Sequence, residues 1–262
     1  MNGGDDIFAG AGAILNPNVT LATFILFCRI GGCLMLMPGI SSAQIPVQVR
    51  LFIAVAVTLS LAPLLLGSAP LRSLSADPIP ALRLIVVETL IGVSIGFLGR
   101  LFFLALETMM VGASTMLGMA NPFGIDVEPN QTLPPLASLV TLSATALIFM
   151  ADVHWEVLRG LAASYRAIPI GADFNPGFSL RQVASILGDT FRVALRVCSP
   201  FFIYAIIVNL AMSVINRLTP QIAIFYTATP FIIAGGLLLL YFSIKPLLGE
   251  FMLGFEAWLI SG

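Results

Sequence analysis

The sequence predicts an all-α membrane protein, built from about six hydrophobic helical segments arranged in hairpins, together with amphipathic helices. Two observations of composition point to this class. Of the 262 residues, 58% are hydrophobic and only 10% are charged, and the mean hydropathy is +1.02. Apolar runs also recur along the chain at lengths that suit a bilayer. We expect one membrane domain over residues 1–262 and no separate soluble domain.

Charge and cysteine content exclude several classes of function. Twelve Lys and Arg residues stand against thirteen Asp and Glu residues, so there is no basic excess and we expect no nucleic-acid partner. Cys28, Cys33 and Cys198 lie in apolar stretches, where thiols behave as small hydrophobic groups. Neither a disulfide framework nor a metal site is indicated. The sequence also lacks a phosphate-binding glycine loop and a haem motif, so we expect no cofactor.

Six apolar runs are candidate membrane spans, because crossing about 30 Å of hydrocarbon takes roughly 20 apolar residues. They are residues 19–38, 51–66, 82–106, 136–151, 197–216 and 222–244. Four charges lie in or next to these runs: Arg29, Glu88, Arg100 and Glu107. Charged side chains are expensive against lipid and normally face protein or water. We therefore predict that these four charges are buried against protein.

Proline-rich segments separate several of the runs. Residues 38–46 and 69–80 are predicted loops, because proline stops helices. Residues 119–135 contain four prolines and cannot form a regular helix. This central segment nevertheless keeps large apolar side chains such as Phe123 and Ile125, which is unusual for a solvated loop.

Two amphipathic helices are predicted between the spans. Residues 152–166 carry one apolar stripe at helical spacing, with Asp152 as the N-cap. A second helix opens at Ser179, where Gln182 completes a capping-box pattern. Helices of this kind lie on a membrane surface or pack within an assembly.

Residues 92–96 (GVSIG) match the pattern of a serine-hydrolase nucleophile elbow. That motif needs a strand, a sharp turn and a helix, whereas this copy lies inside an uninterrupted apolar run. We interpret Gly92 and Gly96 as helix-packing residues, because small residues four apart let two membrane helices approach closely. The alternative, an intramembrane serine protease, would pair Ser94 with His154, the only histidine. We expect His154 instead to be an interfacial anchor beside Trp155.

A proton-coupled transporter is a further alternative, because carboxylates at membrane depth often mark ion pathways. The candidate relay consists of Glu88, Glu107 and Asp152. The arginines available to pair with these carboxylates are Arg29, Arg83 and Arg100. We favour ion pairing, and we find no matching halves of the kind that transporters show. The protease, transporter and assembly hypotheses differ most clearly in whether the chain copurifies with other small membrane proteins.

Proline, arginine and glycine punctuate the chain in a specific order. The stretches concerned are Arg29, Pro38, Pro46, Arg50 and Pro63, then residues 88–97 (ETLIGVSIGF), 118–136, 168–171 (IPIG) and 216–225 (NRLTPQIAIF), with Pro230 beyond. In this pattern most of the chain resembles the R/T-type subunits of the type III export gate, the family of flagellar FliR and its injectisome counterparts. The family commonly has Asp-Pro in its central loop, whereas Asp126 is followed here by Val127.

The resemblance implies a subunit of the flagellar type III export gate in the bacterial inner membrane, at the flagellar basal body. An injectisome export gate is the alternative. Such a subunit is not an enzyme and has no catalytic residues. Its implied partners are P-type and Q-type export-gate subunits in a hetero-oligomer, a B-type switch protein, and the unfolded proteins that are exported.

The resemblance also implies that the central loop projects into the pore and helps to plug it. That role falls on Gly118, Met119, Ala120, Asn121, Pro122, Phe123, Gly124, Ile125 and Asp126. It would explain why a loop broken by proline and glycine keeps apolar side chains.

Overall fold

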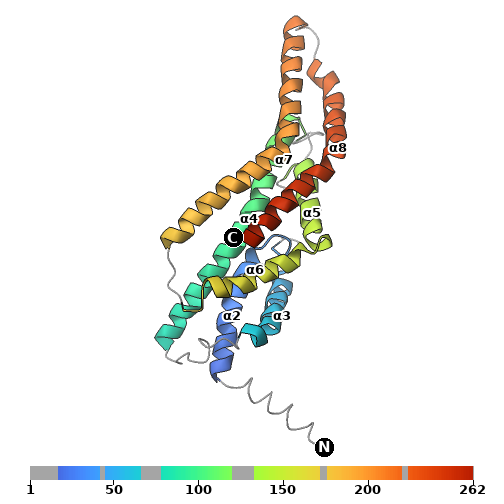
Figure 1. Cartoon of the computed structure of the whole chain (residues 1–262). Coiled ribbons are helices and arrows are strands. Elements are labelled where there is room, and N and C mark those ends of the chain that lie inside the picture. The colour runs from blue at the N-terminus through green and yellow to red at the C-terminus, as the bar shows by residue number, and fades with distance from the viewer. Residues whose placement is uncertain are drawn as a thin grey trace, which may run out of the picture. The chain divides into compact units, whose positions relative to one another are not determined.

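The computed structural model describes residues 17–41, 45–65, 78–119, 133–171, 176–219 and 224–261. Over these residues the chain is helical and contains no strand (Figure 1). The helices are α2 (Pro17–Leu36), α3 (Val47–Leu65), α4 (Pro78–Met116), α5 (Pro135–Met150), α6 (Val153–Ala167), α7 (Pro176–Leu218) and α8 (Ile224–Ser261). Five of the described helices are long and apolar enough to cross a membrane, or six spans if the bent pair α5 and α6 counts as one. The predicted fold class is confirmed.

Helices α4 and α7 each begin at a proline that lies several residues before the predicted start of the helix. Helix α4 starts at Pro78, inside the segment predicted as a loop, because proline is tolerated in the first turn of a helix, where its missing N–H has no partner to lose. Helix α7 starts at Pro176 for the same reason. Ser179 therefore lies inside α7, and the predicted capping box there is wrong.

Helices α7 and α8 are longer than the spans that the sequence predicts, and both contain prolines. Helix α7 has 43 residues and passes through Pro200, so that the predicted second amphipathic helix and the fifth predicted span are one element. Helix α8 has 38 residues and contains Pro230 and Pro246. Membrane helices tolerate proline because neighbouring groups satisfy the backbone carbonyl that it frees.

The chain divides into two compact units, and the boundary falls within helices. Unit 1 comprises residues 1–100 and 155–183. Within it α2 and α3 lie side by side (Figure 1). Helix α3 buries Ala54, Thr58 and Ala62, which share one face because they are spaced four apart. Small residues on this face let the two helices pack closely.

Unit 2 comprises residues 101–154 and 184–262. Phe102 and Phe103 of α4 pack against Phe251 and Phe255 of α8, and the ring centroids of the Phe103–Phe251 pair are 5.2 Å apart in an edge-to-face arrangement. Helix α5 also contacts α8. Edge-to-face aromatic pairs add stabilisation beyond the area that they bury, and this cluster fixes the C-terminal part of α8 against α4.

Both units expose many large apolar side chains. Phe52 of α3 is 75% exposed, Leu210 of α7 is 64% exposed, and Phe231 of α8 is 76% exposed. Apolar patches of this extent mark surfaces that are covered by lipid or by another protein. The isolated chain therefore has the surface of a membrane protein or of an assembly subunit.

Candidate functional site

A buried ion pair joins two helices of unit 1. Helix α2 carries Arg29 and helix α4 carries Glu88, and the side chains of both are fully buried. Arg29 Nε donates to Glu88 Oε2 at 2.6 Å, and Nη2 donates to Oε1 at 3.0 Å. Two parallel hydrogen bonds of this kind give an arginine–carboxylate pair both strength and a fixed geometry.

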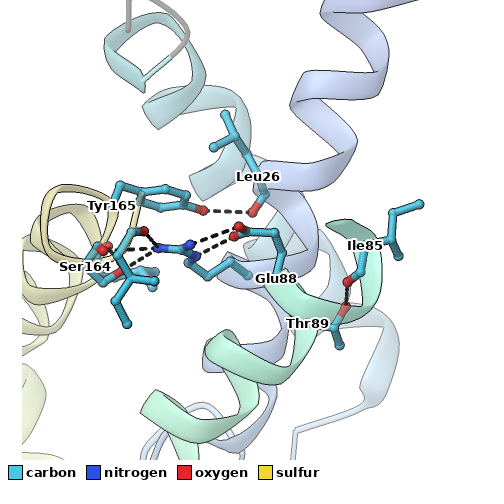
Figure 2. A network of polar contacts seen from close by, with 9 residues as sticks. Leu26, Ile85, Glu88, Thr89, Ser164 and Tyr165 are labelled. Carbon is cyan, nitrogen blue, oxygen red and sulfur yellow. Dashed lines mark hydrogen bonds and ion pairs between the residues drawn. The ribbon is translucent and has the colours of Figure 1, made fainter. Parts of the chain in front are cut away.

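The same guanidinium also binds the end of α6. Arg29 Nη1 donates to the carbonyl oxygens of Ser164 at 3.1 Å and Ile168 at 3.0 Å. The carbonyls at the C-terminal end of a helix carry a partial negative charge, so a cation is well placed there. The Ser164 oxygen accepts from the Ile168 N–H at 2.8 Å as well. Figure 2 shows Glu88, Ser164 and Tyr165 converging on this group from two helices. One arginine thus joins α2, α4 and α6.

Tyr165 encloses the pair from the side of α6. The Arg29 guanidinium carbon lies 4.2 Å from the centroid of the Tyr165 ring, a distance at which the cation is attracted to the ring face. The Tyr165 hydroxyl donates to the carbonyl oxygen of Leu26 at 3.2 Å. We call the group of Arg29, Glu88, Ser164, Tyr165 and the Ile168 carbonyl the arginine clamp.

Glycines bring α2 and α4 close enough for the arginine clamp to form. A Cβ atom on Gly92 would overlap the carbonyl oxygen of Arg29, and one on Gly96 would overlap that of Cys33. From the other helix, a Cβ on Gly32 would lie 3.1 Å from the carbonyl oxygen of Thr89. Glu88 lies one turn before Gly92 on the same face of α4. Because glycine has no side chain, the backbones of α2 and α4 approach each other closely beside the ion pair.

The first two residues of the predicted plug loop terminate α4. Gly118 has a φ of 70°, a conformation that glycine adopts without strain. The N–H groups of Gly118 and Met119 donate to the carbonyl oxygens of Thr115 at 3.1 Å and Ser114 at 2.8 Å, which is the Schellman pattern of a helix end. Residues 120–126, which complete the predicted plug, lie outside the described residues.

Comparison with known proteins supports the resemblance seen in the sequence. The protein family described as "Bacterial export proteins, family 1" matches residues 20–257 of this chain. The chain belongs to this family. It is 26% identical to flagellar biosynthetic protein FliR of Caulobacter vibrioides over 228 residues, which cover 84% of this chain and 87% of that protein. It is 30% identical to FliR of Aquifex aeolicus over 236 residues, covering 86% of each. With FliR of Escherichia coli it shares 26% over 217 residues, or 82% and 80% of the two chains.

Membership of the FliR family makes this chain a non-enzymatic transport component that is embedded in a membrane. The protease alternative is accordingly wrong, and the reason lies in α4. Ser94 stands in an unbroken helix and its hydroxyl donates to the carbonyl oxygen of Leu90 at 2.7 Å. A nucleophile elbow needs a sharp turn at the serine, which a continuous helix cannot supply.

Ser94→Ala should therefore leave the assembly and the export activity of the FliR-family chain unchanged. Only one hydrogen bond within the same helix is lost, which changes stability by less than about 1 kcal/mol. The check is the amount of assembled membrane complex and the rate of protein export in cells, together with labelling by a fluorophosphonate. Loss of export at normal complex yield, or labelling that disappears with Ser94→Ala, would contradict this assignment.

The four predicted buried charges do not share one environment. Arg29 and Glu88 are enclosed, whereas Arg100 and Glu107 are only half-buried in this FliR-family chain. Arg100 Nη1 donates to the Ser41 hydroxyl at 3.2 Å. Long side chains can lay their stems along apolar surface and keep the charge in a polar place, so position within an apolar run does not by itself enclose a charge.

The carboxylates of the candidate relay are also dissimilar. Both oxygens of Glu88 accept from Arg29, which is the ion pairing that we favoured. The side chain of Asp152 is 79% exposed and lies 4.0 Å from His154 Nε2, at a φ of 58° just before α6. Trp155 is 56% exposed. Over the described residues, no group of three metal-binding side chains is close enough to hold a metal ion.

Sequence reasoning missed several groups that complete the site. No sequence signal marks the carbonyls of Ser164 and Ile168. Tyr165 lies within the predicted amphipathic helix, residues 152–166, but nothing in the sequence indicates its contact with Arg29. Gly32 could have been found, because it lies in the first apolar run as Gly92 and Gly96 lie in the third, and paired small residues are typical of close helix crossings.

Proposed function

We propose that this FliR-family chain is a subunit of the flagellar type III protein export gate, in which it forms part of the pore for unfolded flagellar proteins. The observation that carries the proposal is the match over residues 20–257, together with the three FliR relatives named above. The site of action would be the bacterial inner membrane at the flagellar basal body. The flagellar names of the relatives favour this reading over an injectisome gate.

Exposed apolar helices support a hetero-oligomer with P-type and Q-type export-gate subunits. Helix α3 packs through a face of small residues, while Phe52, Leu59 and Leu64 are 75%, 59% and 72% exposed. Surfaces of this composition need lipid or another subunit against them. A B-type switch protein is the further partner that the family resemblance implies.

The arginine clamp supplies the fixed part of the proposed gate. It ties three helices of unit 1 through buried, fully paired groups, and such networks make a structure rigid when every member is satisfied. The moving part in this proposal is the plug loop that the resemblance implies, residues 118–126, from Ala120 onward, because Gly118 and Met119 end α4. A constriction lined by apolar side chains such as Phe123 and Ile125 excludes water and therefore ions. An unfolded polypeptide would displace this loop without unpacking helices.

Deleting residues 120–126, or replacing Phe123 and Ile125 together with serine, should raise the leak of the assembled complex. The apolar constriction becomes wettable, and a wetted pore conducts ions. The measurement is the conductance of intact purified complexes in planar lipid bilayers, with complex yield recorded in parallel. Met119 is retained so that the end of α4 stays intact.

The same variants separate the plug from ordinary packing. If these side chains merely fill space between helices, the substitutions should lower complex yield and leave conductance per complex near zero. Equal, near-zero conductance of the parent and the deletion variant would contradict the plug assignment while leaving the family assignment in place.

A further inference from the structure

We propose that Asn209 and Gly236 form an anchor that fixes the last turn of α4, and that Gly118 and Met119 belong to this anchor rather than to the moving plug. All of these groups lie in unit 2. The proposal rests on the proposed function, because it names the residues that set the point from which the central loop departs. Asn209 is in this sense a positioning residue for the gate.

The backbone at the end of α4 shows why Asn209 is needed. The last four carbonyl groups of a helix have no donor within it. The N–H groups of Leu117, Gly118 and Met119 satisfy three of these carbonyls, at 2.8 to 3.1 Å. Asn209 satisfies the fourth, because its Nδ2 donates to the carbonyl oxygen of Met116 at 3.1 Å.

Asn209 is itself held in place by its own helix. Its Nδ2 also donates to the carbonyl oxygen of Ala205 at 2.8 Å, so both N–H bonds of the amide have acceptors. An amide bonded at both hydrogens has little rotational freedom. The end of α4 is therefore tied to one position along α7.

Helix α8 holds the same turn from another side. Leu117 is 2% exposed and Met119 is 7% exposed. The space above Gly236 is filled by both of them, since a Cβ atom there would lie 3.5 Å from Leu117 Cδ1 and 3.5 Å from Met119 Sδ. Leu117 and Met119, the neighbours of Gly118 in sequence, therefore both pack against Gly236 of α8.

Tyr204 connects the part of the anchor on α7, Asn209, with the part on α8, Gly236. Its hydroxyl donates to the carbonyl oxygen of Ile232 at 3.0 Å, and a Cβ on Gly235 would overlap that hydroxyl. Tyr204 lies just over one turn before Asn209 on α7, and Gly235 precedes Gly236 on α8. The contact keeps α7 and α8 in register where they meet the end of α4 (Figure 1).

The distances predict a graded set of variants. Gly236→Ala adds a methyl at ordinary contact distance and should be tolerated, whereas Gly236→Leu must displace Leu117 or Met119. Asn209→Leu keeps the approximate size of the side chain and removes both donors. Asn209→Gln keeps the donating amide on a longer stem and should restore most of the parental behaviour.

The first readout is the protection of position 119 in the full complex. Met119→Cys is introduced after the three native cysteines have been replaced with alanine, and the rate of labelling by a small maleimide is measured on purified complexes. We expect slow labelling with the parental Asn209 and with Asn209→Gln. We expect labelling at least about tenfold faster with Asn209→Leu, since protection is lost when the last turn opens. The Gly236 variants are tested only in the second readout, because Met119→Cys removes the thioether that fills the space above Gly236.

The second readout is conductance in planar bilayers, measured in complexes that retain Met119. Asn209→Leu and Gly236→Leu should raise the leak toward that of the deletion of residues 120–126, while their matched controls should not. If one disruptive variant fails to assemble, the other and Asn209→Asp, which has the size of asparagine but no donor, provide the same comparison.

The outcomes distinguish the anchor from the plug. Unchanged labelling of position 119 in Asn209→Leu would overturn the anchor, whatever the leak. Faster labelling with a parental leak, when the deletion does leak, would overturn the positioning role. If the deletion itself does not leak, the proposed plug fails, and the labelling rates alone decide whether the anchor stands.

Discussion

Glu88→Gln should prevent most of the chain from entering a stable complex. The substitution leaves the Arg29 guanidinium buried without its counter-charge, and breaking one side of a buried ion pair typically destabilises a protein by about 3–5 kcal/mol. That is a large fraction of the stability of an ordinary domain. The measurements are the yield of intact complex and its midpoint of thermal unfolding in detergent.

An exposed pair in the same unit provides the matched control. Glu156 and Arg159 are joined at 2.5 Å, and the Arg159 side chain is 75% exposed. Because solvent screens such a pair, Glu156→Gln should change stability by less than about 1 kcal/mol. Equal yield and equal midpoints for the two variants would contradict the structural role of the arginine clamp. Normal yield with failed export in Glu88→Gln would instead favour the proton relay.

Gly92→Leu should lower the yield of complex and its thermal midpoint about as much as Glu88→Gln does. Gly92→Ala should lower both as well. A Cβ at this position overlaps the backbone carbonyl oxygen of Arg29, and a backbone atom cannot swing aside as the end of a side chain can. Separating α2 from α4 would stretch the Arg29–Glu88 bonds as well, so we expect a loss of about 3 kcal/mol, the upper part of the range for overpacked cores. Complex yield and the thermal midpoint again provide the measurement.

Two other helical glycines serve as controls. A Cβ on Gly188 of α7 or Gly249 of α8 would meet no atom within 4 Å. Alanine favours a helix over glycine by about 1 kcal/mol, so both alanine variants should match or slightly exceed the parent in stability. If Gly92→Ala behaved like these controls, the close approach of α2 and α4 would be contradicted.

The spans were predictable because a bilayer imposes a length and a composition on every helix that crosses it. The ends of the helices were not. Pro78 and Pro176 lie in first turns, and Pro200 and Pro246 lie inside long helices. The residue is proline in each case, and only the surrounding structure decides whether it stops a helix or is accommodated in it.

The site could be predicted only in part. Features formed by residues close together in the sequence were predictable, and contacts between distant residues were not. Gly92 and Gly96 are four residues apart, so helical geometry alone places them on one face. Arg29 and Glu88 are 59 residues apart, and several arginines were equally plausible partners until the fold was known. Asn209 reaches α4 from 93 residues away, and nothing in its local sequence marks it. Contacts of this kind arise from packing, which no local pattern encodes.

The export-gate proposal is tested by native mass spectrometry of material purified through an affinity tag on this chain. We expect a membrane complex in which this chain is bound to P-type and Q-type export-gate subunits in a fixed ratio, because its exposed apolar helices need protein cover. A monodisperse monomer that is thermally robust in detergent, with neither partner present, would contradict it.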